Sequence, residues 1–334
     1  MSVAPSVVVW GTYDTGKPRV RILLQAARDR GIPLQEIHSE VWRGVEDKSQ
    51  IKGLWRRAQY VIRWLFAYPL LLLRYLLSPR HDLVLVPYMG HLDVIIIQPF
   101  ARLRGARVVW DAMLSLHGTL VEDRGMVTDG SVVAHAIKAW DWLAFRCADQ
   151  LITGTSARAR QYNEQYGVAL ERINPLFIST ELALFSALSD RPSGGDPGQR
   201  PCILFYGQFS PLHGLSTVLQ AAASSQGQQW DWVFVGTGQE GWRLHQWLKT
   251  EARDHVRWLQ WIPYEELPLW INRSDLCLGN FGASQKAVTG IPNKVFQIIA
   301  CGRPLLTADT PAIRELLDPG EPGVYLVPPE DPQA

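Results

Sequence analysis

Short apolar runs that alternate with helical stretches along most of the chain restrict its fold more than any other feature. In the first half they lie at about residues 6–10, 34–38, 82–87, 106–110 and 149–153, and in the second half at about 202–206, 231–235, 256–260, 275–279, 303–307 and 323–327. A continuous apolar run of this length is typical of a strand buried on both faces, and its alternation with helices is typical of a parallel sheet. The sequence therefore predicts an α/β protein with doubly wound parallel sheets.

The two halves begin with similar segments. VVVWGTYDTGKPRVRILLQAA covers residues 7–27 and CILFYGQFSPLHGLSTVLQAA covers 202–222, and a one-residue gap aligns Gly11 with Gly207. A glycine at the end of a strand lets the backbone turn tightly into the next helix, whose N-terminus attracts anions. Any α/β protein repeats this order of elements, so the match alone leaves the function open.

A polar segment divides the chain into two predicted domains. SALSDRPSGGDPGQR, residues 186–200, is rich in Gly, Pro, Ser and charge and has no apolar periodicity, as expected of an interdomain linker. We therefore expect an N-terminal domain over residues 1–185 and a C-terminal domain over 201–334, each large enough for its own core. The chain ends soon after its last apolar run, so we expect the second domain to be cut short, without a helix that crosses back to the first.

Composition argues against several classes of protein. A formal net charge of +1 and 19% charged residues argue against a nucleic-acid binder that uses a broad basic surface. The four cysteines lie far apart, with no CxxC pair and no zinc-ligand spacing, so we expect reduced thiols and no metal site. The N-terminus shows no secretory signal, which makes the cytoplasm the expected location.

Residues 51–80 form an apolar segment with six basic residues and no acidic one. Helical spacing places five polar residues on one face: Lys52, Arg56, Gln59, Arg63 and Arg74. Pro69 is expected to kink or break a single helix, and the charges interrupt the segment too often for a membrane span of about 20 apolar residues. Two interpretations stay open: a helix packed on the sheet with its arginines in water, or a membrane-surface segment with its arginines on anionic lipid.

Four segments of the second half resemble a known family, and their order along the chain is the specific part of the resemblance. They are FYGQFSPLHGLSTVLQAA, VFVGTGQE, VRWLQWIPYEELPLWINRSDLCLGNFG and IPNKVFQIIACGRPLLTADTPAIRELL. In the first half, WGTYDTGKPR, YMGHLDV, DAMLSLHGTLVEDRG and LITGTSARARQY add to it. Together they resemble a retaining GT-B glycosyltransferase of family 4, in a bacterial subgroup that makes polysaccharides. The resemblance implies two Rossmann-like domains that face a central cleft, a nucleotide sugar on the C-terminal domain, a glycan acceptor on the N-terminal domain, and no cofactor or metal.

The resemblance also implies residues for the donor, a UDP- or GDP-linked sugar. His213 and Lys294 are the catalytic candidates, with a protonated His213 in place of a usual lysine and Lys286 as a further cation. The amide of Gln297 stands where the family carries a ribose-binding glutamate. The turn Gly279–Gly282 is expected to bring its backbone close to the sugar phosphate, whereas Trp261 fits either a base contact or a core position. The binding candidates are Gly207, Gln208, Gly236, Gly238, Trp261, Ile262, Asn280, Phe281, Gly282, Asn293 and Gln297.

Polar residues at strand ends of the first half are candidates for the acceptor side. Asp111 directly follows an apolar run and is the third catalytic candidate. The loop from Gly11 to Gly16 is glycine-bounded, and contacts to acceptor or donor phosphate are expected from Asp14, Lys17 and Arg19. The remaining candidates are His91, Asp93 and Arg124. A polar residue at a strand end is often only a helix cap, so both roles stay open for each.

We therefore expect a retaining transferase that moves a hexose from a nucleotide-diphosphate sugar to a glycan acceptor. In the membrane-surface interpretation of residues 51–80, the acceptor is lipid-linked and lies at the cytoplasmic face of the membrane. Two alternatives remain: a GT-B sugar-nucleotide epimerase, and a non-catalytic partner subunit. The second is motivated by Gln208, His213 and Gln297, which depart from the family pattern.

Overall fold

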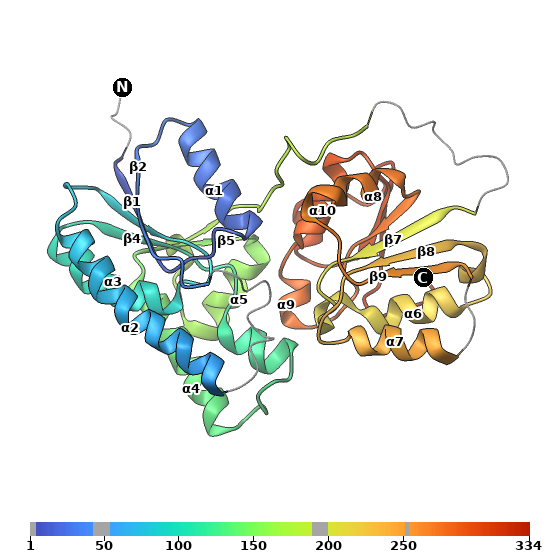
Figure 1. The fold of residues 1–334 in the computed structure, drawn as a ribbon, viewed down its shortest axis with the longest axis horizontal. Helices are drawn as coiled ribbons and strands as arrows, with labels where there is room; N and C mark the ends of the chain where they lie inside the picture. The colour runs from blue at the N-terminus through green and yellow to red at the C-terminus, as the bar shows by residue number, and fades with distance from the viewer. Residues whose placement is uncertain (1–4, 43–53, 189–199, 251–253) are drawn as a thin grey trace. The chain divides into compact units, whose positions relative to one another are not determined.

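The computed structural model describes residues 5–42, 54–188, 200–250 and 254–334, which form two compact units (Figure 1). The first unit contains residues up to His117 together with Gly130–Gly154 and Ala159–Phe177. The second contains Gly118–Asp129, Thr155–Arg158 and the chain from Ile178 onward. Most of the predicted linker, residues 189–199, lies outside the described residues.

The first unit is built on a six-stranded parallel sheet with strand order β2-β1-β3-β4-β5-β6. Its strands are β1 (Val7–Gly11), β2 (Leu34–His38), β3 (Leu83–Val86), β4 (Arg107–Asp111), β5 (Gln150–Thr153) and β6 (Ile173–Pro175). The helices that follow the first five strands in turn are α1 (Pro18–Asp29), α2 (Leu54–Leu76), α3 (His91–Leu103), α4 (Val132–Cys147) and α5 (Ser156–Tyr166).

Alternate residues of β1 supply the two sides of this unit's core. Val9 packs with Val20 and Leu24 of α1 in a small cluster on one face of the sheet. Val8 and Trp10 point to the other face and join a large cluster with residues of α2, α3 and α4. Both faces of β1 are thus covered, which explains its continuous apolar sequence.

The helix α2 runs unbroken from Leu54 to Leu76 and contains Pro69, so the predicted break is wrong. Proline removes one intrahelical hydrogen bond, and packing can offset that cost. Residues on both sides of the proline, Tyr68 and Leu71, are buried in the same cluster and hold the helix to the sheet. Lys52 lies outside the described residues, as does the side chain of Arg56.

The second unit contains a six-stranded parallel sheet with strand order β12-β11-β10-β7-β8-β9. Its strands are β7 (Cys202–Tyr206), β8 (Asp231–Val235), β9 (Val256–Leu259), β10 (Leu276–Leu278), β11 (Leu305–Ala308) and β12 (Val324–Val327). The α-helices are α6 (Leu215–Ala223), α7 (Gly241–Thr250), α8 (Leu267–Arg273), α9 (Gln285–Val288) and α10 (Asn293–Ala300).

The strand order of this sheet locates its ligand-binding edge. From β7 the chain builds outward through β8 and β9, and it then returns to the other side of β7 to add β10, β11 and β12. This is the 3-2-1-4-5-6 arrangement, in which ligands bind outside the carboxyl ends of the two strands where the direction reverses. Those strands are β7 and β10.

The described residues include no helix that is long and apolar enough to span a membrane. They also include no group of three or more His, Cys, Asp or Glu side chains arranged to hold a metal ion. All four cysteines are free thiols, with Cys277 and Cys301 buried in the core and Cys147 and Cys202 half-buried.

Candidate functional site

Four residues from separate parts of the second unit surround one point at the reversal between β7 and β10. Gly207 follows β7 with φ of +134°, a conformation that side chains disfavour, and Gly279 follows β10. A Cβ atom placed on Gly207 would lie 3.4 Å from the His213 ring and 3.6 Å from Lys294 Nζ. Lys294 Nζ in turn donates to the carbonyl oxygen of Gly279 at 3.3 Å. The structure thus brings together two predicted catalytic residues and the turn after β10.

Lys294 is a buried cation at this point. Only 5% of the residue is exposed, and its ammonium lies 4.6 Å from the ring centroid of Phe205 and 5.5 Å from that of Tyr206. Aromatic faces attract a cation but do not neutralise it. Burial lowers the pKa of Lys294 to about 7, so its charge depends on what else occupies the site.

His213 ends a short helical turn, Pro211–His213, directly before α6. Its Nδ1 atom accepts a hydrogen bond from Ser210 N at 3.4 Å. Burial, reinforced by the charge of Lys294, lowers the pKa of His213 well below its usual value. The protonated imidazole expected beside a bound phosphate stays a prediction, and the lowered pKa favours a neutral ring when no anion is bound.

A second group of charges approaches His213 from residues Gly118–Asp129, which come from the first half of the sequence but belong to the second unit. Lys286 Nζ lies 3.2 Å from Asp123 Oδ2, and Ser284 Oγ donates to Asp123 Oδ1 at 3.2 Å. Arg124 lowers the pKa of both His213 and Lys286 through its charge. Arg124, expected on the acceptor side, thus lies in the second unit, where its charge acts on His213 and Lys286. Asp123 was missed by the sequence analysis although it adjoins Arg124 in the same motif.

Two helices begin at the same edge without a side-chain cap. Gly214 precedes α6 with φ of +67°, and a Cβ atom there would lie 2.8 Å from the carbonyl carbon of Phe281. Pro292 precedes α10, whose first two residues are Asn293 and Lys294. The first N–H groups of an uncapped helix favour an anionic ligand.

The backbone N–H groups of the turn Gly279–Gly282 are engaged within the protein, and close approach of this backbone to a sugar phosphate stays a prediction. Phe281 N donates to His213 O and Gly282 N donates to Leu212 O, each at 3.2 Å. Gly279 N and Asn280 N donate to acceptors on β11. These N–H groups tie the turn to its neighbours and leave none for a phosphate. The Asn280 side chain is different, since its buried Oδ1 atom has no hydrogen-bond partner among the described residues.

Gln297, the expected ribose contact, lies in a chain of buried hydrogen bonds. Tyr206 Oη donates to Gln297 Oε1 at 3.0 Å, and Gln297 Nε2 donates to Tyr264 Oη at 3.3 Å. Tyr264 Oη donates in turn to Glu181 Oε2 at 2.9 Å. The sequence analysis missed these two tyrosines and Glu181, which are spread over the chain. The ribose contact stays a prediction, and an amide at position 297 is explained by the need both to accept and to donate.

Of the other predicted donor-binding residues, two are glycines that the loops require, and three are partly or largely exposed. A Cβ atom on Gly236 would lie 2.1 Å from Gly207 O, and one on Gly238 would lie 2.8 Å from Phe209 N, so the loops after β7 and β8 require glycine there. Gln208 is exposed and Ile262 is half-buried against the core. Trp261 is 65% exposed, which excludes the core explanation for this residue.

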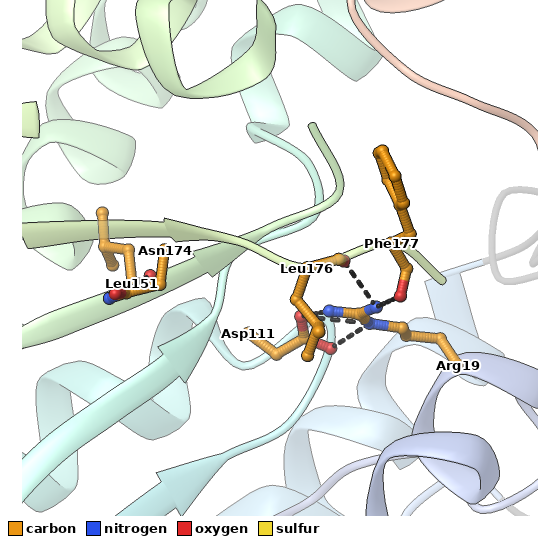
Figure 2. A network of polar contacts seen from close by, with 6 residues as sticks. All are labelled: Arg19, Asp111, Leu151, Asn174, Leu176 and Phe177. Carbon is orange, nitrogen blue, oxygen red and sulfur yellow. Dashed lines mark hydrogen bonds and ion pairs between the residues drawn. The ribbon is translucent and has the colours of Figure 1, made fainter. Parts of the chain in front are cut away.

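In the first unit, Asp111 lies at the end of β4 as predicted, but its carboxylate is fully engaged (Figure 2). Arg19 Nη2 and Nε donate to it at 2.8 Å and 3.0 Å, and both side chains are buried. Arg19 Nη1 also donates to the carbonyl oxygens of Leu176 and Phe177 just after β6. The phosphate contact expected of Arg19 is therefore wrong, and the contacts of Asp111 support a structural ion pair.

Asp93 occupies the reversal point of the first sheet, between β1 and β3. Its carboxylate accepts hydrogen bonds from Thr12 N at 3.1 Å and from Tyr68 Oη at 3.0 Å. A Cβ atom on Gly11 would lie 2.7 Å from it. Burial, and the nearby charge of Asp93, raise the pKa of Tyr68. A buried carboxylate at this position repels an anionic ligand.

The other first-unit candidates have local roles. His91 is 4% exposed, its Nε2 atom lies 3.4 Å from Asp141 Oδ1, and burial lowers its pKa to about 4, which makes it neutral. Asp141 accepts N–H groups from Leu116 and His117, while burial raises its pKa to about 6. Asp14 accepts from Gly16 N within its own turn. These contacts do not bring the acceptor-side candidates into one site.

Residues 200–334 match the family described as Glycosyl transferases group 1. No curated protein gives a significant sequence match. The catalogue of solved structures contains many matches that extend over both units.

Sucrose-phosphate synthase from Thermosynechococcus elongatus matches 99% of this chain and 88% of its own at 16% identity, with a TM-score of 0.71. HepE from Anabaena in complex with UDP-glucose matches 98% of this chain and 86% of its own at 13% identity, with a TM-score of 0.60. The lipopolysaccharide outer core galactosyltransferase WaaB matches 97% of this chain and 85% of its own at 14% identity, with a TM-score of 0.54. At these identities the likeness shows the fold, and the predicted GT-B architecture of two Rossmann-like domains is confirmed.

Proposed function

We propose that this protein transfers a hexose from a nucleotide-diphosphate sugar to a glycan acceptor with retention of anomeric configuration, because residues 200–334 match the glycosyl transferases group 1 family. The observation that carries the proposal is the difference between the two reversal points. The one in the second unit holds Lys294 and the His213 ring beside an uncapped α6, whereas the one in the first unit holds the carboxylate of Asp93. A diphosphate belongs at the former.

The residues around Gly207 have the properties that a leaving diphosphate requires. Lys294 takes up a proton as the anion binds, since its pKa near 7 rises beside a negative charge. The Nε2–H group of His213 donates to a phosphate oxygen, and the first N–H groups of α6 and α10 add their dipoles. These groups already lie at the site before charge develops on the leaving oxygen, so little reorganisation is needed.

In the proposed reaction, the bond between the anomeric carbon and the diphosphate oxygen breaks as the acceptor hydroxyl forms a bond on the same face of the sugar. The hydroxyl proton passes to the leaving phosphate oxygen, and the products are a glycoside and a nucleoside diphosphate. The protein contributes alignment of the two substrates and stabilisation of the developing charge.

We propose a UDP-linked hexose as the donor to test first. HepE, one of the structures with this fold, is described in complex with UDP and with UDP-glucose. In this chain, the exposed indole of Trp261 offers a stacking surface for a base, and the unpaired Asn280 Oδ1 offers an acceptor for a hydroxyl group.

For the acceptor, we propose a glycan carried on a lipid at the cytoplasmic face of the membrane. This part of the proposal is supported by residues 51–80, which carry six basic residues and no acidic one in a largely apolar sequence.

A thermal-shift panel of UDP, GDP and their hexose conjugates tests the donor. A ligand at 100 times its Kd stabilises the folded protein by about 2.7 kcal/mol, and we expect the UDP compounds to produce such a shift. Lys249 is an exposed lysine on α7, so Lys249→Met serves as the control for Lys294→Met. The control should leave the nucleotide-induced shift in melting temperature unchanged. If no nucleotide shifts the melting temperature, the protein is a non-catalytic partner subunit and the proposal is wrong.

Product analysis with a labelled UDP-hexose and a lipid-linked glycan tests the transfer. We expect label in the glycan with the anomeric configuration of the donor. Label found only in an epimerised nucleotide sugar would identify an epimerase instead, and an inverted glycoside would disprove retention.

A further inference from the structure

The helix α2 lies on the outside of the first unit (Figure 1), and several of its apolar side chains are exposed. We call the surface that they form the α2 outer face and define it by seven exposed residues: Ile62, Leu65, Phe66, Leu70, Leu73, Leu76 and Leu77. Phe66 is 78% exposed and Leu77 is 76% exposed. Single exposed apolar residues are normal on a protein surface, but a contiguous group of this kind marks an interaction site.

The α2 outer face is not needed to hold the helix in place. Ile62, Phe66, Leu70, Leu73 and Leu77 recur at steps of four, four, three and four, so they form one stripe along α2. The opposite stripe contains Ala67, Tyr68, Leu71 and Tyr75, which are buried in the main core. Apolar residues of a helix normally face the core. The helix α2 has a second apolar stripe, which is exposed.

Basic residues border this apolar stripe. Arg63 and Arg74 are exposed and eleven positions apart, about three helical turns, so they lie at the same edge of the α2 outer face. Each also donates to a backbone carbonyl of the segment after β2, Arg63 to Val41 O at 3.3 Å and Arg74 to His38 O at 3.4 Å. The sequence contains no acidic residue between Asp47 and Asp82.

We infer that the α2 outer face docks the protein on an anionic lipid surface. In such a contact the apolar stripe enters the boundary between headgroups and acyl chains, and the arginines reach the phosphate layer. A second copy of the chain suits this face less well, because a symmetric contact would bring two sets of arginines together without a carboxylate. The inference concerns the first unit and does not depend on the donor site proposed above.

Co-sedimentation of the full chain with lipid vesicles tests this inference. We expect the wild type to bind vesicles that contain phosphatidylglycerol and to bind pure phosphatidylcholine vesicles far more weakly. Phe66→Glu with Leu77→Glu should lower the partition coefficient at least tenfold. Arg63→Gln with Arg74→Gln should lower binding to the anionic vesicles about fivefold for each arginine removed.

The helix α7 of the second unit offers matched controls. Trp242 is 52% exposed, and the Arg243 guanidinium lies 4.8 Å from its ring centroid. Trp242→Glu and Arg243→Gln make the same kinds of change on another exposed helix, and both should leave vesicle binding unchanged. Circular dichroism and the UDP-induced thermal shift report whether each variant is folded.

Three results would overturn the inference: no wild-type binding to anionic vesicles, equal binding by the Phe66→Glu, Leu77→Glu variant, or an equal loss in Trp242→Glu. Light scattering that shows a dimer abolished by Phe66→Glu, together with no vesicle binding, would assign the face to a second copy of the chain instead. Vesicle binding without any nucleotide-induced shift would leave this inference standing and disprove only the proposed function.

Discussion

In the proposed function, Lys294 favours diphosphate binding at the expense of stability. Its pKa is about 7 in the folded protein, whereas an unfolded chain holds the proton up to about pH 10.4. Between these values the unfolded state binds more protons, so this residue makes stability rise with pH by up to about 1.4 kcal/mol per unit above pH 7. Below pH 7 the folded protein bears the full cost of a buried ammonium.

We therefore predict that Lys294→Met stabilises the unliganded protein, most clearly at pH 7 and below. Each kcal/mol recovered should raise Tm by at least about 2 °C. Urea unfolding at pH 6.5, 7.5 and 8.5 measures the effect, with Lys249→Met as the control. A variant less stable than the wild type at pH 6.5 would show that the ammonium contributes to folding, contrary to this interpretation.

Lys294 should also make nucleotide binding depend on pH. The bound diphosphate requires the protonated amine, so above pH 7 binding must be accompanied by proton uptake. We predict that UDP affinity falls by up to tenfold per pH unit above pH 7, and that Lys294→Met binds weakly with a flat profile over the same range. Calorimetry in two buffers of different ionisation enthalpy measures both the affinity and the proton uptake. Uptake that is equal in the two proteins would assign the proton to another group.

At the scale of elements, one ion pair joins three parts of the first unit. Arg19 in the first turn of α1 binds Asp111 at the end of β4 and two carbonyls just after β6 (Figure 2). Removing one member of a buried pair leaves the other charge without a partner, which typically costs about 3–5 kcal/mol.

We predict that Arg19→Met lowers the free energy of unfolding by about 3–5 kcal/mol and that adding Asp111→Asn recovers much of this loss. Urea unfolding of the two single variants and the double variant measures the coupling. Nucleotide-induced stabilisation, measured in the same proteins, should persist in the folded fraction. If Asp111→Asn alone abolished transfer while the fold and UDP binding were intact, Asp111 would be catalytic after all.

Most elements could be predicted because their signals are local. The strand β7 begins and ends where its apolar run does, and α10 begins after Pro292 as its proline indicates. The sequence alone could not show that α2 continues through Pro69, because buried contacts on both sides decide this. It also missed β6, a three-residue strand that ends in proline.

The candidate site could be predicted only where its residues follow strands. Gly207 was found from the order of strand, glycine and helix, which is a local pattern, whereas Lys294 was found through the family resemblance of the helix that begins at Asn293. The partners of Gln297 come from β7, from the segment before α8 and from Glu181, and their hydrogen bonds exist only in the folded chain. The lowered pKa of His213 likewise depends on its burial in the folded chain and on cations that are distant in sequence.

At the scale of the whole molecule, the boundary between the units does not coincide with a single point in the sequence. Residues 118–129 and 155–158 precede the linker segment, yet they belong to the second unit. Asp123 reaches Lys286 across 163 positions, and Glu315 accepts the backbone N–H groups of Ser156 and Ala157 at the start of α5. A pattern read along the chain detects composition changes and cannot detect such pairings.

The segment that carries Asp123 therefore sets both the stability and the charge of a site formed mainly by the second half of the sequence. The Asp123 side chain is fully buried and pairs with Lys286. Burial lowers the pKa of His213, and the charges of Lys294, Lys286 and Arg124 lower it further. Replacing the acid should leave more positive charge near the proposed diphosphate position. We predict that Asp123→Asn lowers the free energy of unfolding by about 3 kcal/mol and yet raises UDP affinity several-fold.

Lys286→Met is the opposite change at the same pair, and it should lower both stability and UDP affinity. Denaturant unfolding and calorimetry on the two variants give the four quantities. Opposite effects on affinity with the same effect on stability are expected only if the pair acts on the ligand through its charge. If both variants weakened UDP binding in proportion to their loss of stability, the pair would be a packing contact, and the Gly118–Asp129 segment would have no electrostatic role at the site.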